Sequence, residues 1–241
     1  QGEAAEKKIA ELEGLLIDNP LDERVLFKLV ALYKQLNLLD KAREKLQVLI
    51  DTYPHNTKYQ ESLTQISDLY YLKTINKLNE KLSFEPDNET LKAELARIRT
   101  QRRDDEIAQI NRRIEAYPND LNLRFELGEL LYEKGDHNAA ISQFQLSVKD
   151  PAKLTASLTN LGLCFKAKQM YDLAVEQFKK ALGKETTINA VTKDIIYHLG
   201  TTYELMGKQA EAIEEFKKIY GIDISYRDVA SKIDKFYKGD Q

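Results

Sequence analysis

Apolar residues recur every three to four positions along most of this 241-residue chain, a spacing typical of one face of an α-helix rather than of a β-strand. Five prolines interrupt the pattern at intervals of 34, 32, 32 and 33 residues: Pro20, Pro54, Pro86, Pro118 and Pro151. Proline breaks helices and restricts the residue before it to extended conformations. Because each interval has room for two helices of about 13 residues and their turns, the pattern predicts an internal helical repeat.

Four segments align without gaps, and we count positions from their first residues, Glu23, Leu121, Thr155 and Lys193. Position 8 is glycine or valine: Val30, Gly128, Gly162 and Gly200. Position 20 is always alanine: Ala42, Ala140, Ala174 and Ala212. Position 24 is large: Leu46, Phe144, Phe178 and Phe216. Small residues let two helix backbones approach closely and large ones fill the space beside the crossing, so each segment is predicted to be a packed helix pair.

Three of these segments resemble the tetratricopeptide repeat: ELGELLYEKGDHNAAISQF, NLGLCFKAKQMYDLAVEQF and HLGTTYELMGKQAEAIEEF. The family pattern is a Leu-Gly pair, a tyrosine, and then Ala and Phe four residues apart. The resemblance implies an all-α fold, namely a right-handed α-solenoid of tetratricopeptide-like helix pairs with N- and C-terminal capping helices. Gly135 and Gly207 fall where a first helix has to end. The closing stretch FKKIYGIDISYRDVASKI resembles the endings of uncharacterised bacterial members.

The middle of the chain keeps the proline interval but lacks the Leu-Gly pair and the alanine. Its apolar stripe shifts by half a turn between Ile66 and Ile75, and again between Ile98 and Ile107. Two interpretations stay open: 57–88 and 89–120 are degenerate helix pairs, or each is one long helix of a hairpin. The absence of Gly, Pro or Asn-rich turns in 57–75 and 91–110 favours the long helices.

The two ends of the chain are expected to close the array, since an open end exposes a hydrophobic face. We expect a single solenoid over 1–241, with a lone helix in 1–20 and a capping helix in 225–238. That last helix is predicted from about Tyr226 to Phe236, and Ser225 with Asp228 would form its capping box. The regular repeats are expected at 23–56, 121–154, 155–188 and 193–224.

Composition narrows the function classes. The hydrophobic fraction of 42% is enough for a packed core, and the net charge of -3 with interspersed charges disfavours a nucleic-acid partner. No apolar run is long enough for direct membrane insertion. The chain starts Gln-Gly without a methionine, so we expect a trimmed N-terminus and leave the compartment, cytoplasmic or periplasmic, open.

The residues offer no recognisable chemistry, so we predict no catalytic residue, no cofactor and no metal. Neither a phosphate-binding glycine loop nor a nucleophile-elbow serine is present. The three histidines, His55, His137 and His198, lack metal-ligand spacing to one another. Cys164 is expected to be a small buried residue, because a nucleophile would need a base within reach.

The resemblance instead implies a concave groove lined by the first helices, in which positions 2, 5, 6, 9, 12 and 13 face a ligand. The candidate partner-binding residues on those positions are Phe125, Glu126, Glu129, Tyr132, Glu133, Asn160, Leu163, Lys166, Tyr197, His198 and Thr201. We expect exposed aromatic rings at Phe125, Tyr132 and Tyr197. For His198, a solvated surface position is the alternative to a groove contact.

Some members of the family hold the C-terminal carboxylates of a peptide with Lys, Asn and Arg side chains at these positions. In this chain only Asn160 is of a matching residue type. Glu126, Glu129 and Glu133 share one helix face, so the groove is expected to prefer basic or polar-aromatic segments. The function expected from these positions is a scaffold or adaptor that binds a protein or peptide partner in the groove of 121–210. Two alternatives stay open: a structural protein that self-associates, and a non-catalytic module of a larger enzyme or membrane protein.

Overall fold

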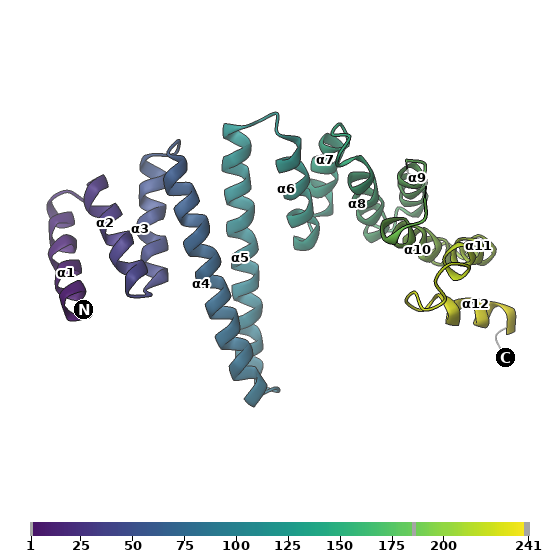
Figure 1. Ribbon diagram of the computed structural model, residues 1–241, viewed down its shortest axis with the longest axis horizontal. Helices are drawn as coiled ribbons and strands as arrows, with labels where there is room; N and C mark the ends of the chain where they lie inside the picture. The colour runs from purple at the N-terminus through teal and green to yellow at the C-terminus, as the bar shows by residue number, and fades with distance from the viewer. Residues whose placement is uncertain (1, 185–186, 239–241) are drawn as a thin grey trace. The chain divides into compact units, whose positions relative to one another are not determined.

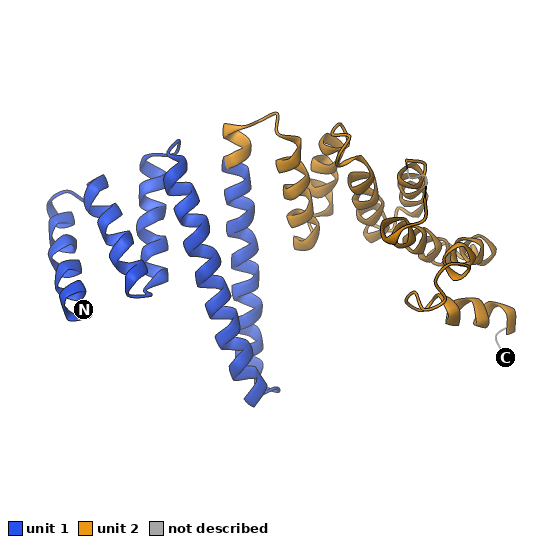
Figure 2. Ribbon diagram, in the orientation of Figure 1, with its two compact units in different colours: residues 1–112 blue, residues 113–241 orange. Residues whose placement is uncertain are grey.

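A computed structural model describes residues 2–184 and 187–238, and its regular elements are twelve helices, α1 to α12 (Figure 1). No strand occurs in those residues. The expected all-α solenoid of helix pairs is confirmed. The chain divides into two compact units, which we call unit 1 (residues 1–112) and unit 2 (residues 113–241) (Figure 2). The expected single array and its repeat boundaries stay predictions.

Unit 1 contains one single helix, one helix pair and two long helices. Their bounds are α1 Gly2–Asp18, α2 Glu23–Gln35, α3 Leu39–Thr52, α4 Thr57–Phe84 and α5 Glu89–Ala116, the last turn of α5 falling in unit 2. Unit 2 contains three helix pairs and a final helix. Their bounds are α6 Leu121–Lys134, α7 His137–Ser147, α8 Leu154–Ala167, α9 Tyr171–Leu182, α10 Ala190–Leu205, α11 Gln209–Tyr220 and α12 Val229–Lys238.

The prolines work together with a polar residue two positions later. Asp22, Asn56, Asn88 and Asp120 each follow a proline at this spacing. Each accepts a hydrogen bond through its side chain from a backbone N–H in the first turn of the following helix, at 2.9 to 3.2 Å. This capping satisfies N–H groups that have no partner inside the helix. The proline interval therefore sets where α2, α4, α5 and α6 begin.

Position 15 ends the first helix of each regular repeat in a left-handed backbone conformation. The φ angle is 59° at Asn37, 89° at Gly135, 61° at Gln169 and 74° at Gly207. The expected role of the two glycines is confirmed. Asparagine tolerates this conformation better than most residues, whereas glutamine at position 169 carries a steric cost.

The small residues at positions 8 and 20 allow the close helix crossing that their pattern predicts. A Cβ atom added to Gly128, Gly162 or Gly200 would lie 2.5 to 2.6 Å from the phenylalanine ring at position 24 of the same repeat. The alanines at position 20 are fully buried in all four repeats. In the repeat of unit 1, the same two places hold Val30 and Leu46, both buried. A larger residue at position 8 is thus paired with a smaller one at position 24.

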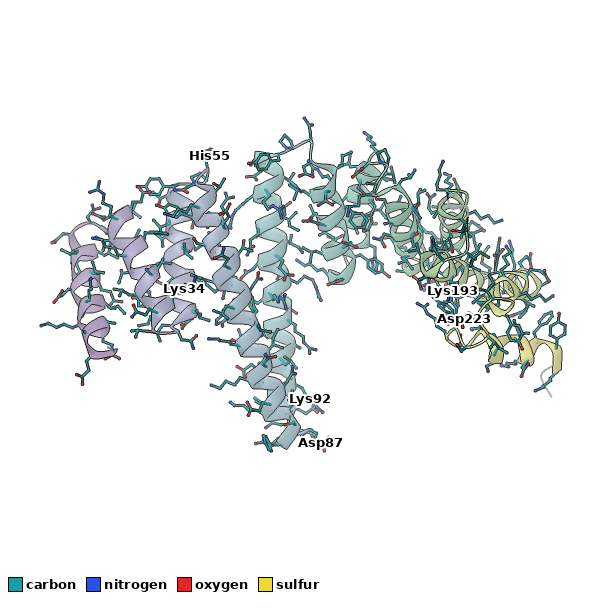
Figure 3. The ribbon with its side chains drawn as sticks, in the orientation of Figure 1. Lys34, His55, Asp87, Lys92, Lys193 and Asp223 are labelled. Atoms are coloured by element: carbon teal, nitrogen blue, oxygen red, sulfur yellow. The ribbon has the colours of Figure 1, made fainter. Side chains whose placement is uncertain are left out.

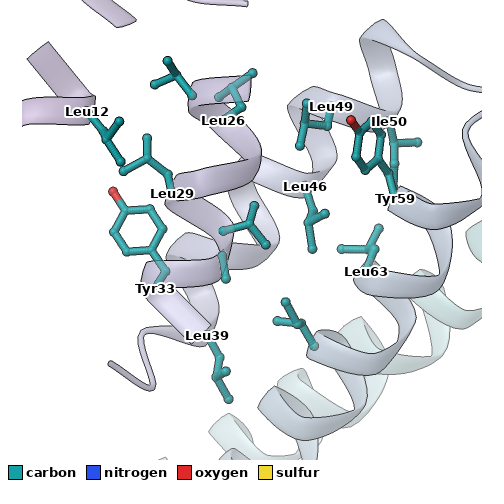
Figure 4. Close-up of a cluster of buried hydrophobic side chains, with 14 of the residues drawn as sticks. Leu12, Leu26, Leu29, Tyr33, Leu39, Leu46, Leu49, Ile50, Tyr59 and Leu63 are labelled. Carbon is teal, nitrogen blue, oxygen red and sulfur yellow. The ribbon is translucent and has the colours of Figure 1, made fainter. Parts of the chain in front are cut away.

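The core of unit 1 gathers leucines from α1 to α4 around Leu29 and Leu46 (Figure 4). Two tyrosines at its margin keep their rings in the core and donate their hydroxyls to carboxylates. Tyr33 donates to Glu13 of α1, and Tyr59 donates to Glu23 of α2. These bonds let aromatic rings fill the core while each hydroxyl keeps a partner.

Helices α4 and α5 are each continuous over 28 residues, as the long-helix alternative for the middle of the chain expects. In Figure 1 both extend beyond the short helices of unit 1. Their distal halves pack on each other through Tyr71, Leu78, Leu95 and Ile98. Where the apolar stripe shifts, Arg43 of α3 donates to Ser67, Tyr71 and Asp105. This polar network joins α3, α4 and α5 where the core of the hairpin ends.

The start predicted for the last helix is wrong. Helix α12 begins at Val229 rather than near Tyr226. Instead of capping this helix, the Ser225 hydroxyl donates to Asp223 at 2.9 Å. Arg227 has a left-handed φ of 49°, which stops the helix from starting earlier. The sequence has the spacing of a capping box, but the serine hydroxyl is engaged in a local turn with Asp223 and does not cap the helix.

Candidate functional site

The candidate residues lie on the first helices of unit 2, α6, α8 and α10, and we call their shared surface the first-helix face. Side chains of neighbouring helices come close to one another across it. The Asn160 amide of α8 lies near enough to the Glu129 carboxylate of α6 to lower the pKa of that carboxylate. The Lys166 ammonium of α8 donates to the Thr201 hydroxyl of α10 at 2.6 Å. The register therefore brings predicted positions from all three helices onto one continuous surface.

Phe125 is not an exposed aromatic residue, and that expectation is wrong. Its side chain is only 7% exposed. The ring lies edge-on to Phe144, with centroids 5.8 Å apart, and the Lys153 ammonium lies 4.7 Å from its centroid. Phe125 therefore belongs to the core between α6, α7 and α8 and is not part of the accessible surface of the face. Leu163 is similarly half-buried against the hydrophobic core of unit 2.

Three glutamates give the α6 part of the face its negative charge. Glu126 accepts from the Asn122 amide and lies 3.5 Å from the Arg113 guanidinium, and Glu133 is exposed. Glu129 is exposed as a residue, but partial desolvation of its carboxylate raises its pKa, and the charges of the two flanking glutamates add to the rise. Lys153 and Asn160 oppose it. A carboxylate whose pKa is raised by burial and by like charges gains from an added cation.

Tyr132 is half-buried rather than exposed, so it only partly matches the expectation. Its ring lies 5.3 Å from the imidazole of His137 at the start of α7. Burial raises the pKa of its hydroxyl. Only part of its side chain is therefore accessible on the face.

Lys166 and His198 form the polar centre of the face between α8 and α10. Burial lowers the pKa of Lys166, while Glu204 opposes this change. His198 is mostly buried rather than a solvated surface histidine: its ring stacks on Phe178 at 6.0 Å and its Nε2 lies 3.5 Å from Asp194. Burial also lowers the pKa of His198, so its ring is largely neutral near pH 7.

The α10 end of the face is already occupied by the segment that leads into α12. The Tyr197 hydroxyl donates to Asp228 at 2.8 Å, and the Arg227 guanidinium lies 4.5 Å from the Tyr197 ring centroid. Lys193 pairs with Asp223 at 2.7 Å (Figure 3). Tyr197 is therefore not free for a ligand. The repeat register contained no information about this covering, because it depends on a turn that follows the last repeat.

Cys164 lies where expected, fully buried in unit 2. Burial raises the pKa of its thiol to about 12, so the thiol stays protonated near neutral pH. In residues 2–184 and 187–238 there is no group of three His, Cys, Asp or Glu side chains that could hold a metal ion. None of the helices within the described ranges is both long and apolar enough to cross a membrane.

Comparison with protein families gives one consistent result. Models described as tetratricopeptide repeat match residues 24–56, 100–154, 155–183 and 194–223, which together make up more than half of the chain. One match begins inside α5, whose second half is therefore read as part of a repeat. No curated protein matches the chain.

Solved structures agree in fold at low sequence identity. A structure titled YrrB, a TPR protein with an unusual peptide-binding site, is 16% identical at a TM-score of 0.52, covering 91% of this chain and 96% of its own. PilW, titled a type IV pilus biogenesis factor, is 15% identical at 0.50, covering 95% and 91%. MamA is 23% identical at 0.51, covering 60% and 82%. These similarities concern the fold alone.

Proposed function

This chain belongs to the tetratricopeptide repeat family, and from that premise we propose that its first-helix face binds a basic or basic-aromatic segment of a partner protein. Members of this family are generally non-catalytic modules of protein interaction. The proposed docking surface is the part of the face on α6 and α8, since the α10 end is covered by the chain itself.

The observation that carries the proposal is the glutamate row on α6. Glu126, Glu129 and Glu133 lie within two turns, and Asn160 of the next first helix lies near enough to Glu129 to lower its pKa. Like charges at this spacing repel one another, and a bound lysine or arginine would reduce this repulsion. Asn160 and the accessible part of Tyr132 supply the neutral polar and aromatic contacts for the rest of the segment.

Fluorescence anisotropy with a labelled peptide of alternating lysine and tyrosine tests this proposal. Neutralising the row with Glu126→Gln and Glu129→Gln is expected to weaken binding by about tenfold, and more salt should weaken binding to the parent protein as well. Glu211→Gln on α11, a second helix, is the matched control and should leave affinity within about twofold. Equal affinity for a glutamate-tyrosine peptide would refute a preference for basic segments.

A further inference from the structure

Unit 1 contains a pocket of its own. It has a volume of about 290 Å³ and is lined by α3, α4 and the second half of α5. Leu63 and Ala108 contribute apolar surface to it. This size is at the lower end of ligand sites and fits one long side chain rather than a cofactor.

Side-chain contacts bridge α3 and α5 at two levels along the pocket. At one level Arg43 pairs with Asp105, and at the other Arg112 lies 3.4 Å from the Gln47 amide oxygen. All four residues line the pocket. The Arg112 contact is long for a hydrogen bond, which leaves most N–H groups of this guanidinium available.

The α3 rim of the pocket is acidic. Asp40 and Glu44 are one helical turn apart on the same face and both line the pocket. Asp40 is exposed, and Glu44 is contacted at 3.2 Å by the neighbouring Lys45. Two carboxylates at this spacing destabilise the free helix, and a shared cation removes that repulsion.

Next to the pocket, the chain places one of its own arginines among aromatic and acidic groups. The Arg43 guanidinium lies 4.5 Å and 4.7 Å from the ring centroids of Tyr70 and Tyr71 and donates to the Asp105 carboxylate. Its side chain is 15% exposed. A guanidinium is thus already held here by carboxylate and aromatic groups, the interactions that suit its planar, weakly hydrated charge.

We propose that this pocket is a second docking site, which receives an arginine side chain from a peptide segment of a partner protein. The aliphatic part of that side chain packs on Leu63 and Ala108, and its guanidinium bridges Asp40 and Glu44. Carbonyl groups of the segment accept hydrogen bonds from Arg112 and Gln109. The site lies in unit 1 and does not depend on the first-helix face of unit 2.

The test is a nuclear magnetic resonance titration of the full chain with the blocked tripeptide acetyl-Gly-Arg-Gly-amide. We expect saturable shifts of unit 1 amides in α3 and α5, with a dissociation constant on the order of 1 mM. The same peptide with glutamate in place of arginine should cause no saturable shift. Shifts confined to unit 2, or equal responses to both peptides, would overturn the proposal.

Two variants connect the titration to the pocket. Asp40→Asn with Glu44→Gln is expected to weaken arginine-peptide binding by about tenfold, while Glu61→Gln on α4, exposed and outside the pocket, should leave it unchanged. Circular dichroism melting of each variant verifies that the fold is intact. The unit 2 variant Glu126→Gln with Glu129→Gln should bind the tripeptide normally. If only that variant loses binding, the peptide occupies the first-helix face and the pocket is not the site.

Discussion

The repeats of unit 2 and the long hairpin of unit 1 fill the same proline interval in different ways. In unit 2 the chain turns at position 15, where Gly135, Gln169 and Gly207 have left-handed backbones. Counted from Thr57, position 15 of α4 is Tyr71, which is 1% exposed and donates its hydroxyl to Asp105 at 2.6 Å. A buried, hydrogen-bonded tyrosine favours continuation of the helix. The comparison teaches that position 15 differs between a helix pair and a long helix: the backbone there is left-handed in the pairs, whereas in α4 the same position is a buried, helical tyrosine.

The helix crossings differ between the units as well. In unit 2 a glycine at position 8 lies against a phenylalanine ring at position 24, whereas unit 1 has Val30 and Leu46 at these positions. The two residue pairs fill a similar space, but the side-chain volume is divided differently between the first and the second helix. Exchanging residues between them should therefore break the packing of either unit unless both positions change.

The largest expected effect comes from Gly162→Val. The new side chain would collide with Phe178, because even a Cβ atom there lies 2.5 Å from the ring. We expect unit 2 to lose about 3 kcal/mol of unfolding free energy, measured by urea denaturation with hydrogen exchange to locate the change. Gly14→Val in α1, where a Cβ meets no atom within 4 Å, is the control. If Gly162→Val lost no more unfolding free energy than the control, the helix crossing would not be tightly packed.

A smaller loss is expected from Arg43→Met in unit 1. The substitution leaves Tyr71 and Asp105 without their cationic partner where the hairpin leaves the packed helices. Since the Asp105 side chain is 36% exposed, water compensates in part, and we expect a loss of about 2 kcal/mol. Faster hydrogen exchange in the distal halves of α4 and α5 would locate it. Lys45→Met, which removes only a surface pair, should change stability by about 0.5 kcal/mol or less.

A gain is expected from Gln169→Gly. Glutamine at φ 61° carries the cost of a left-handed conformation, which glycine avoids. We expect unit 2 to become more stable by about 1 kcal/mol in thermal and urea unfolding. Gly135→Ala tests the opposite exchange at the same repeat position and should lose a similar amount. Unchanged stability in both variants would mean that position 15 does not control the turn.

The smallest effect near neutral pH concerns Cys164. Burial raises the pKa of the folded thiol from 9.0 to about 12. Between these values the folded chain holds a proton that the unfolded chain releases, so this contribution to stability is complete below pH 9 and decreases as pH rises. We expect slow alkylation of the native protein at pH 8, and a steeper loss of stability above pH 9 than in Cys164→Ala. Rapid alkylation would show that the core of unit 2 is open.

Much of the fold was predictable because proline, glycine and alanine act locally. Proline with an Asn or Asp two residues later starts a helix, and glycine at position 15 ends one. The buried Phe125 and the covered Tyr197 were not predictable from the register. The burial of Phe125 results from its contact with Phe144, and the covering of Tyr197 results from the turn at Arg227. Both depend on a neighbouring segment that the position within the repeat does not specify. Position within a repeat predicts the helix face but not what covers it.

The most direct test of the account is a double-mutant cycle of Gly162→Val and Phe178→Leu, read by urea unfolding of unit 2. Each single change should be destabilising, the first through a collision and the second through lost packing. If the Val30–Leu46 arrangement of unit 1 can replace the glycine–phenylalanine one, the double variant is more stable than the sum of the two losses predicts, by about 2 kcal/mol. Strictly additive losses would contradict the account, because the two positions would then not share one packed crossing.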